Sequence, residues 1–241
     1  MKLSVVVPAY NEERLLGASL AAIREGLAAF EAAGWEAELV VCDNNSTDRT
    51  AEIARAAGAR VVFEPINQIS RARNTGARAG SGDWLLFVDA DSFPSRALFA
   101  DVLDAIGRGR VLAGGSTLAI DNGPWWGKLG LAGWNLMSRK LRWGSGAFVF
   151  CEAAAFREVG GFDETLYASE ELELFRRLKR LARRTGRTVE ILDRHPLKTS
   201  ARKLHLYSFG EFARLFLKTL FTFGRTLRRR EDCSVWYDGR R

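Results

Sequence analysis

Residues 84–92 (WLLFVDADS) constrain this chain more than any other stretch. The first five are apolar and include aromatic and β-branched side chains, and a continuous run of this length predicts a strand buried on both faces. The run ends in Asp89-Ala90-Asp91, and Pro94 follows. An Asp-x-Asp pair after a buried strand is predicted to lie at the carboxyl edge of a sheet, where open α/β sheets bind ligands. Two carboxylates so close together favour a divalent cation that holds a diphosphate; the alternative is that they cap a helix beginning near Pro94.

Three further apolar segments with strand character precede this one, and helical patterns separate the four. The strands are expected at residues 3–7, 39–42, 61–63 and 84–88, and the helices at residues 11–34, 49–58 and 70–80. This alternation predicts a parallel sheet with right-handed crossovers. Because the carboxyl ends of parallel strands share one edge, we expect Tyr10, Asp43, Asp89 and Asp91 to converge. A polar edge of this kind is typical of a nucleotide site.

The glycine motifs of two common nucleotide-binding folds are missing from the sequence. No Gly-x-Gly-x-x-Gly follows the first predicted strand, and no Gly-x-x-x-x-Gly-Lys occurs anywhere. Both absences argue against a dinucleotide-binding or P-loop protein.

Charge and cysteine content limit the partners and the compartment. The 241 residues include 36 Lys and Arg against 29 Asp and Glu, a net charge of +7, which favours anionic partners such as nucleotides or phospholipid surfaces. No recognised nucleic-acid-binding module accompanies this charge, so we expect no nucleic-acid partner. Cys42, Cys151 and Cys233 are widely spaced and odd in number, which predicts reduced thiols in a cytoplasmic protein rather than a disulfide framework or a zinc site. Because every stretch of 18 residues contains at least one charged residue, we expect no transmembrane helix.

A strong helical pattern in the second half of the chain covers residues 169–183. Ser169 occupies the predicted N-cap position, and Glu170 and Glu171 fall in the first turn. Carboxylates in a first turn interact favourably with the helix dipole. The glutamate pair can therefore be explained by helix stability alone.

Seven short motifs occur in a fixed order along the chain. They are VVVPAYNEE at residues 5–13, VCDNNSTD at 41–48, RNTGA at 73–77, FVDAD at 87–91, GAF at 146–148, VGGFDE at 159–164 and SEE at 169–171. Together they strongly resemble the inverting family 2 glycosyltransferases of GT-A fold, over roughly residues 3–185. The resemblance implies an α/β nucleotide-diphospho-sugar transferase fold, with a mostly parallel central sheet flanked by helices and a C-terminal helical extension.

The resemblance also implies which residues hold the donor. In the family, the Pro-x-Tyr-Asn loop and the Asp after the second strand hold the base and ribose, and a basic residue of the third helix, here Arg71 or Arg73, often contacts the base. The Gly-Ala-Phe segment lines the donor-sugar and acceptor cleft. The donor-binding positions carried over in this way are Pro8, Ala9, Tyr10, Glu12, Asp43, Arg71, Arg73, Asn74, Asp89, Ala90, Gly146 and Ala147.

The family resemblance further implies that the protein uses a divalent metal, Mn²⁺ or Mg²⁺. By position, Asp91 ligates the metal, and Asp89 touches the ribose or a metal-bound water. Some GT-A enzymes use a late histidine as a third ligand. His195 is either such a ligand or an exposed loop residue.

The late acidic motif departs from the family pattern. In the family this motif is commonly Glu-Asp, with the Asp as general base, whereas this chain has Glu170-Glu171. By position Glu171 is the base, but its extra methylene moves the carboxylate outward, so Glu170 stays an alternative. The expected reaction is metal-dependent transfer of a sugar from a nucleoside-diphosphate sugar to an acceptor hydroxyl, with inversion. A non-catalytic nucleotide-sugar-binding protein and a nucleotidyltransferase are the alternatives.

The predicted domain organisation places a catalytic domain at residues 1–205 and a basic tail at 206–241. The first contains a nucleotide-binding half, 1–92, and an acceptor half, 93–205. A helical pattern at residues 209–227 has a wide apolar face, which must pack on the catalytic domain, in a homodimer or on a membrane surface. The last option predicts a protein on the inner face of the membrane with a lipid-linked acceptor. Arg202 and Lys203 either close over the diphosphate or are simply solvated.

Overall fold

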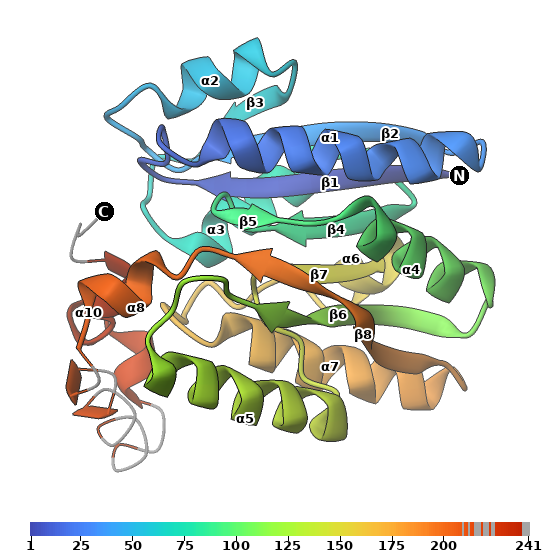
Figure 1. Cartoon of the computed structure of the whole chain (residues 1–241). Coiled ribbons are helices and arrows are strands. Elements are labelled where there is room, and N and C mark those ends of the chain that lie inside the picture. The colour runs from blue at the N-terminus through green and yellow to red at the C-terminus, as the bar shows by residue number, and fades with distance from the viewer. Residues whose placement is uncertain (209, 212, 215–217, 219–221, 223–224, 238–241) are drawn as a thin grey trace.

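The computed structural model describes residues 1–208, 210–211, 213–214, 218, 222 and 225–237. These residues form an eight-stranded sheet with helices on both faces (Figure 1). The strand order is β3-β2-β1-β4-β7-β6-β8-β5. The expected α/β architecture with a mostly parallel sheet is confirmed.

The first half of the chain forms the parallel part of the sheet. Its elements are β1 (Lys2–Ala9), α1 (Leu16–Ala32), β2 (Glu36–Asp43), α2 (Thr50–Ala56), β3 (Arg60–Phe63), α3 (Ile69–Ala79) and β4 (Trp84–Val88). β1 pairs in parallel with both β2 and β4, and β2 pairs in parallel with β3. All seven elements occur in the predicted order, because the apolar runs and helical periods in this half are clear. Two predicted ends are wrong: β1 continues through Pro8 to Ala9, and α1 begins at Leu16 and not at residue 11.

The second half extends the sheet with mixed pairing. Its elements are β5 (Ser92–Phe93), α4 (Arg96–Gly107), β6 (Val111–Ala119), α5 (Trp125–Leu141), β7 (Phe148–Glu152), α6 (Ala153–Glu158), α7 (Glu170–Arg184), β8 (Thr188–Thr199), α8 (Arg202–Leu206), the 3₁₀ turns η1 (Arg225–Arg228) and η2 (Arg230–Asp232), and α10 (Ser234–Tyr237). β7 runs antiparallel to both β4 and β6, whereas β6 and β8 are parallel.

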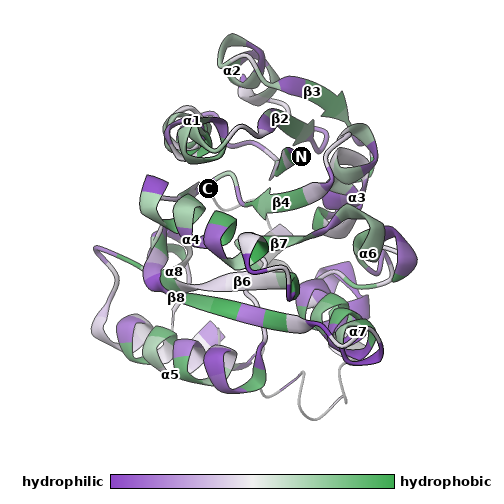
Figure 2. Ribbon diagram, turned by 90° about the vertical axis from the view of Figure 1, so that its right-hand side faces the viewer, coloured by the Kyte–Doolittle hydropathy of each residue, from purple (hydrophilic) through white to green (hydrophobic). Residues whose placement is uncertain are grey.

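Two hydrophobic cores cover the two faces of the sheet, and β4 contributes to both. Trp84, Leu86 and Val88 face the core built with α1 and α4, and Leu85 and Phe87 face the core built with α6 and α7. Successive side chains of a strand point to opposite faces, so a central strand needs an unbroken apolar run. Figure 2 shows β4 as largely hydrophobic along its length.

Of the two interpretations that concern helix caps, the alternative for Asp89 and Asp91 is wrong, whereas Ser169 occupies the predicted N-cap position without a side-chain hydrogen bond. The N-cap of α4 is Ser95, whose hydroxyl accepts a hydrogen bond from the Leu98 amide at 3.1 Å; Asp89 and Asp91 therefore do not cap this helix. Ser169 precedes α7, but it has a left-handed backbone with φ of 60° and its side chain caps no amide.

The tail from residue 206 onward packs against the preceding part of the chain where it is described. The Tyr167 amide donates to the Leu227 carbonyl at 2.7 Å, and the Ile69 amide donates to the Tyr237 hydroxyl at 3.3 Å. Most of the predicted amphipathic helix at 209–227 lies outside the described residues. None of the helices that the structure describes combines the length and the hydropathy that a bilayer crossing requires.

Candidate active site

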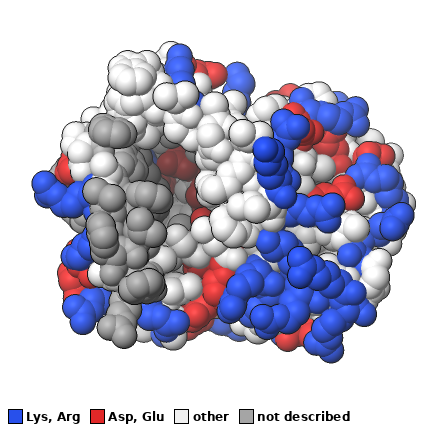
Figure 3. Space-filling view, turned by 90° about the horizontal axis from the view of Figure 1, so that it is seen from below, with Lys and Arg blue, Asp and Glu red and all other residues white. Residues whose placement is uncertain are grey.

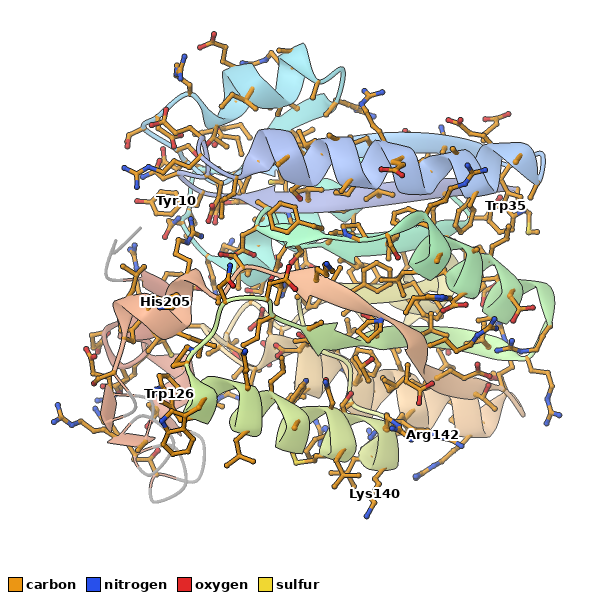
Figure 4. All side chains as sticks on the ribbon, viewed as in Figure 1. Tyr10, Trp35, Trp126, Lys140, Arg142 and His205 are labelled. Carbon is orange, nitrogen blue, oxygen red and sulfur yellow. The ribbon has the colours of Figure 1, made fainter. Side chains whose placement is uncertain are left out.

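The candidate site lies at the carboxyl ends of β1, β2 and β4. Ala9 at the end of β1 is in register with Asp43 at the end of β2, and the Asn44 amide donates to the Ala9 carbonyl at 2.8 Å. Tyr10 follows β1 directly and marks this edge in Figure 4. The parallel pairing of the strands thus brings the two nucleotide-binding loops predicted from the sequence side by side.

These two loops are fastened to each other by polar contacts. The Asn11 amide donates to the Ser46 hydroxyl at 3.0 Å, and the Thr47 amide donates to Asn11 Oδ1 at 2.8 Å. Asn11 and Asn45 have left-handed backbones, with φ of 50° and 66°. Asparagine tolerates this conformation better than most residues, so the sequence suits two tight turns at the edge of the sheet.

The Asp-x-Asp loop is held from both sides. The Asp89 amide donates to the Ala147 carbonyl at 3.2 Å, which fastens it to the segment before β7, and the Ser200 amide donates to the Asp91 carbonyl at 3.0 Å. Ala90 and Ala147 are buried. These contacts involve only backbone atoms of Asp89 and Asp91. Both carboxylates are therefore available for ion pairs.

Arg73 of α3 is the centre of the site. Its side chain is 2% exposed, and it donates to Asp89 Oδ1 at 2.8 Å, to Glu170 Oε1 at 2.5 Å and to the Gly146 carbonyl at 2.8 Å. Its guanidinium also lies 5.2 Å from the Phe162 ring centroid. Burial alone would lower the pKa of Arg73, but the charges of Asp89 and Glu170 outweigh it and raise that pKa. One buried cation therefore joins three motifs that are distant in the sequence.

Glycine at position 146 is required by this arrangement. A Cβ atom there would lie 2.8 Å from Arg73 Nη2. The Gly-Ala-Phe motif thus leaves space for the guanidinium while its carbonyl accepts the hydrogen bond.

A second arginine joins the first loop to the Asp-x-Asp pair. Arg202 at the start of α8 donates to Glu12 at 2.7 and 2.9 Å and lies 3.4 Å from Asp91 Oδ2. These charges raise the pKa of Arg202 against the effect of burial. The sequence identifies Glu12, Asp91 and Arg202 separately, but no pattern in it pairs residues that are 190 positions apart.

Glu170 and Glu171 have different surroundings although they are adjacent. Glu170 is 3% exposed and is paired with Arg73; burial raises its pKa, and the Arg73 charge opposes that effect. Glu171 is only partly buried. Burial, followed by the negative charge of Glu170, raises the pKa of Glu171 to about 8. A partly accessible carboxylate with a pKa near neutrality is suited to exchange a proton with a ligand.

Two predicted donor-binding residues, Asn74 and Arg71, have other partners. Asn74 is buried, with its amide donating to the Phe162 carbonyl and its oxygen accepting from the Phe162 amide, so it positions the Gly-Gly-Phe turn. Arg71 pairs with Glu164 at 3.1 Å. The structure thus separates Arg71 from Arg73, and it is Arg73 that contacts the acidic residues of the site.

His195 lies in β8, not in a loop as the sequence suggested. Its Nδ1 is 2.8 Å from Asp101 Oδ2 of α4. In the described part of the chain, no group of three or more His, Cys, Asp and Glu side chains is arranged to hold a metal, so the structure does not bring His195 to Asp89 and Asp91. The apolar run at 188–192 continues as a strand because β6 and β5 both pair with it.

The remaining donor set still fits a divalent cation of the Mg²⁺ class. Asp89 and Asp91 offer carboxylate oxygens, and each already accepts from a cationic guanidinium. Such ions are commonly held by one or two carboxylates together with substrate phosphates and water. The residues therefore suit a metal that arrives with a diphosphate, rather than one held by protein ligands alone. Seen from below, Asp and Glu atoms lie at the bottom of a hollow (Figure 3).

Comparison with known proteins gives a family match and several relatives. The model of "Glycosyl transferase family 2" matches residues 4–163. An uncharacterized glycosyltransferase of Mycobacterium tuberculosis is 32% identical over 140 residues, or 56% of this chain and 60% of that protein. The dolichol-phosphate mannosyltransferase of Pyrococcus furiosus is 30% identical over 138 residues, or 54% of this chain and 38% of that protein. The chain thus matches less than two thirds of the length of these relatives.

Solved structures share the fold at low sequence identity. The mannosyltransferase PcManGT from Pyrobaculum calidifontis, in complex with GDP-Man and Mn²⁺, has a TM-score of 0.67 at 18% identity, covering 98% of this chain and 67% of that one. Glucosyl-3-phosphoglycerate synthase from Mycobacterium tuberculosis, solved with Mn²⁺, UDP and glucosyl-3-phosphoglycerate, has a TM-score of 0.61 at 21% identity, covering 92% and 79%.

Proposed function

The chain belongs to glycosyl transferase family 2 and has the GT-A fold, and from this premise we propose that it transfers a sugar from a nucleoside-diphosphate sugar to an acceptor hydroxyl with inversion. The observation that carries the proposal is the pairing of Arg73 with both Asp89 and Glu170. This pairing holds the Asp-x-Asp loop and the start of α7 at one site. Relatives of the same fold were solved with GDP-Man or UDP-Glc and Mn²⁺, which supports the donor class and the metal.

Asp91 and Asp89 would hold the metal at the end of β4. When bound, the metal supplies positive charge that stabilises the departing diphosphate. Arg202 lies against Asp91, so its guanidinium offers a second positive charge on the same side of the site. The loops at Tyr10 and Asp43 are proposed to hold the nucleoside.

Glu171 is the proposed general base. The acceptor oxygen forms a bond to the anomeric carbon, the bond from that carbon to the diphosphate oxygen breaks, and the acceptor proton passes to Glu171. A single displacement of this kind inverts the anomeric carbon. Glu170 is a poorer base because its carboxylate is buried and committed to Arg73, whereas Glu171 is partly accessible.

The acceptor is proposed to be lipid-linked, and the protein to work on the cytoplasmic face of a membrane. One relative is named a dolichol-phosphate mannosyltransferase, which supports this acceptor class. Incubation with labelled nucleotide sugars and a membrane lipid extract should place label in the chloroform-extractable fraction. Label confined to water-soluble products would contradict a lipid-linked acceptor.

The Glu171→Gln variant tests the base. We expect turnover to fall by about 10²–10⁴-fold, the usual contribution of a general base, while nucleotide-sugar affinity with Mn²⁺ is retained. Turnover is followed by release of nucleoside diphosphate, and affinity by calorimetry. Glu173→Gln is the matched control, since Glu173 lies in the same turn but pairs with Arg176 and Arg177. Full turnover in Glu171→Gln would move the role to Glu170, and binding without turnover in the wild-type protein would favour a non-catalytic binding protein.

A further inference from the structure

Helix α5 carries an unusual amount of exposed apolar surface. Among the described residues, eight large hydrophobic side chains are exposed, and five belong to this helix: Trp125, Leu129, Leu136, Met137 and Leu141. Trp125 is 77% exposed, Leu129 67% and Leu136 54%. Their spacing of four and seven residues places these three on one stripe of the helix. Soluble proteins rarely leave such a stripe open unless it binds something.

The opposite side of α5 is firmly attached to the sheet. Asn135 accepts a hydrogen bond from the Leu118 amide at 3.0 Å and donates to the Leu118 carbonyl at 2.9 Å, so it pairs with β6 as a neighbouring strand would. Ser138 is buried and donates to the Trp143 carbonyl at 2.5 Å. The apolar stripe is therefore presented outward by a fixed helix.

A basic cavity adjoins the C-terminal end of the helix. It has a volume of about 500 Å³ and lies between the end of α5, α7 and the start of β8. The basic residues that line it are Lys140, Arg142, Lys179, Arg183 and Arg187. Figure 3 shows a dense cluster of Lys and Arg beside an uncharged band on this face, and Figure 4 shows Lys140 and Arg142 at the opposite end of α5 from Trp126.

The charge of this cavity is largely uncompensated. Arg187 pairs with Glu152, but in the described part of the chain no acidic group lies within ion-pair distance of Lys140, Arg142 or Arg183. Lys179 is 5.4 Å from the Trp143 ring centroid. Burial, then the charges of Arg183 and Arg142, lower the pKa of Lys179. Converging positive charges of this kind favour a phosphate group.

We infer that α5 and the basic cavity, together the α5 face, dock the protein on an anionic phospholipid bilayer. Trp125, Leu129 and Leu136 enter the interface, and the cavity binds lipid phosphates. Tryptophan and leucine on one side of a helix with lysine and arginine around them are typical of interfacial helices, and α5 contains no acidic residue. This inference deepens the membrane location given under the proposed function by naming the surface that binds, and vesicle binding can be measured whether or not the protein transfers a sugar. A second copy of the chain is the competing occupant.

Flotation on a density gradient tests the inference with the full chain. The probes are vesicles of phosphatidylcholine alone and of phosphatidylcholine mixed with phosphatidylglycerol. We expect the protein to float with the mixed vesicles at low salt, and binding to weaken as salt rises because surface charges are screened. No flotation with the mixed vesicles at low salt, or equal flotation with both vesicles, would overturn the inference.

Two double variants and two controls separate the components of the α5 face. Leu129→Gln with Leu136→Gln should lower vesicle partitioning by about tenfold or more, and Arg142→Gln with Arg183→Gln by roughly 30-fold at low salt. Phe63→Gln and Arg55→Gln alter exposed residues of β3 and α2, and we expect them to leave binding unchanged. Unchanged partitioning of both double variants, or a dimer in solution that the leucine variant dissociates, would overturn the inference. Circular dichroism and the melting temperature of each variant show that it is folded, and neither measurement depends on the enzyme assignment.

Discussion

At the scale of single residues, one buried guanidinium organises the candidate site. Arg73 pairs with Asp89 and Glu170, and burial raises the pKa of Glu170, an effect that the Arg73 charge opposes. Isolated buried charges are strongly unfavourable, so removal of one member of such a group leaves the others uncompensated. In the part of the chain that the structure describes, Glu171 makes no ion pair with a Lys or Arg side chain, and it is partly accessible.

The Arg73→Met variant should be markedly less stable than the wild-type protein. Breaking a buried ion pair on one side typically costs 3–5 kcal/mol, and here two carboxylates lose their partner. Urea unfolding followed by circular dichroism measures the loss. Arg71→Met is the control, because Arg71 is partly exposed and its pair with Glu164 should contribute under about 1 kcal/mol. Equal stability of the two variants would contradict the central role of Arg73.

Turnover should depend on pH through Glu171. A general base must be ionised, and the pKa of Glu171 is raised to about 8, so kcat/KM should rise about tenfold per pH unit below that value and level off above it. The position of the bend is read from a pH profile of the wild-type protein. In Glu171→Asp we expect the rise to persist with a displaced midpoint. A profile that is already flat between pH 6 and pH 9 would contradict the assignment.

At the scale of elements, the site depends on segments that meet at the ends of strands. The parallel order β2-β1-β4 brings together the loops after β1, β2 and β4, as the sequence predicts. The start of α8 closes this edge from the other end of the chain through Arg202. The sequence predicts only that Arg202 and Lys203 either close over the diphosphate or are solvated, and it does not predict the contact with Glu12. The present partners of Arg202, which are Glu12 and Asp91, suggest that the guanidinium and a metal compete for the same carboxylate.

The Arg202→Gln variant tests that competition. Without the cation near Asp91, binding of Mn²⁺ in the absence of nucleotide should tighten by about fivefold, equivalent to roughly 1 kcal/mol. Binding of UDP or GDP with Mn²⁺ should weaken, because a positive charge near the diphosphate is lost. Paramagnetic resonance of free Mn²⁺ measures the first quantity without any turnover. Arg49→Gln, which breaks an exposed pair with Glu13, should change neither, and unchanged Mn²⁺ affinity in Arg202→Gln would exclude the competition.

At the scale of the whole molecule, acidic and basic groups occupy different places. The acidic residues of the site gather at the carboxyl edge of the sheet, whereas uncompensated basic residues gather between α5 and α7. The N-terminal end of α5, marked by Trp126, lies on the same side of the molecule as Tyr10 and His205 in Figure 4. A bilayer bound to the α5 face would therefore lie close to the edge that holds the candidate site, which suits an acceptor carried by a lipid.

The sequence by itself determined the order and type of the elements of the first half and the position of the Asp-x-Asp pair. It could do so because hydrophobic period and turn residues act over a few positions. Only the tertiary structure decided which distant residues meet. The insertion of β7 between β4 and β6, the contact of Arg73 with Glu170 across 97 positions and that of Arg202 with Glu12 across 190 all depend on strand pairing. The same is true of His195, which lies in the long strand β8 beside Asp101. These choices result from the packing of the whole chain, because each partner gains its contact only when the other elements are in place.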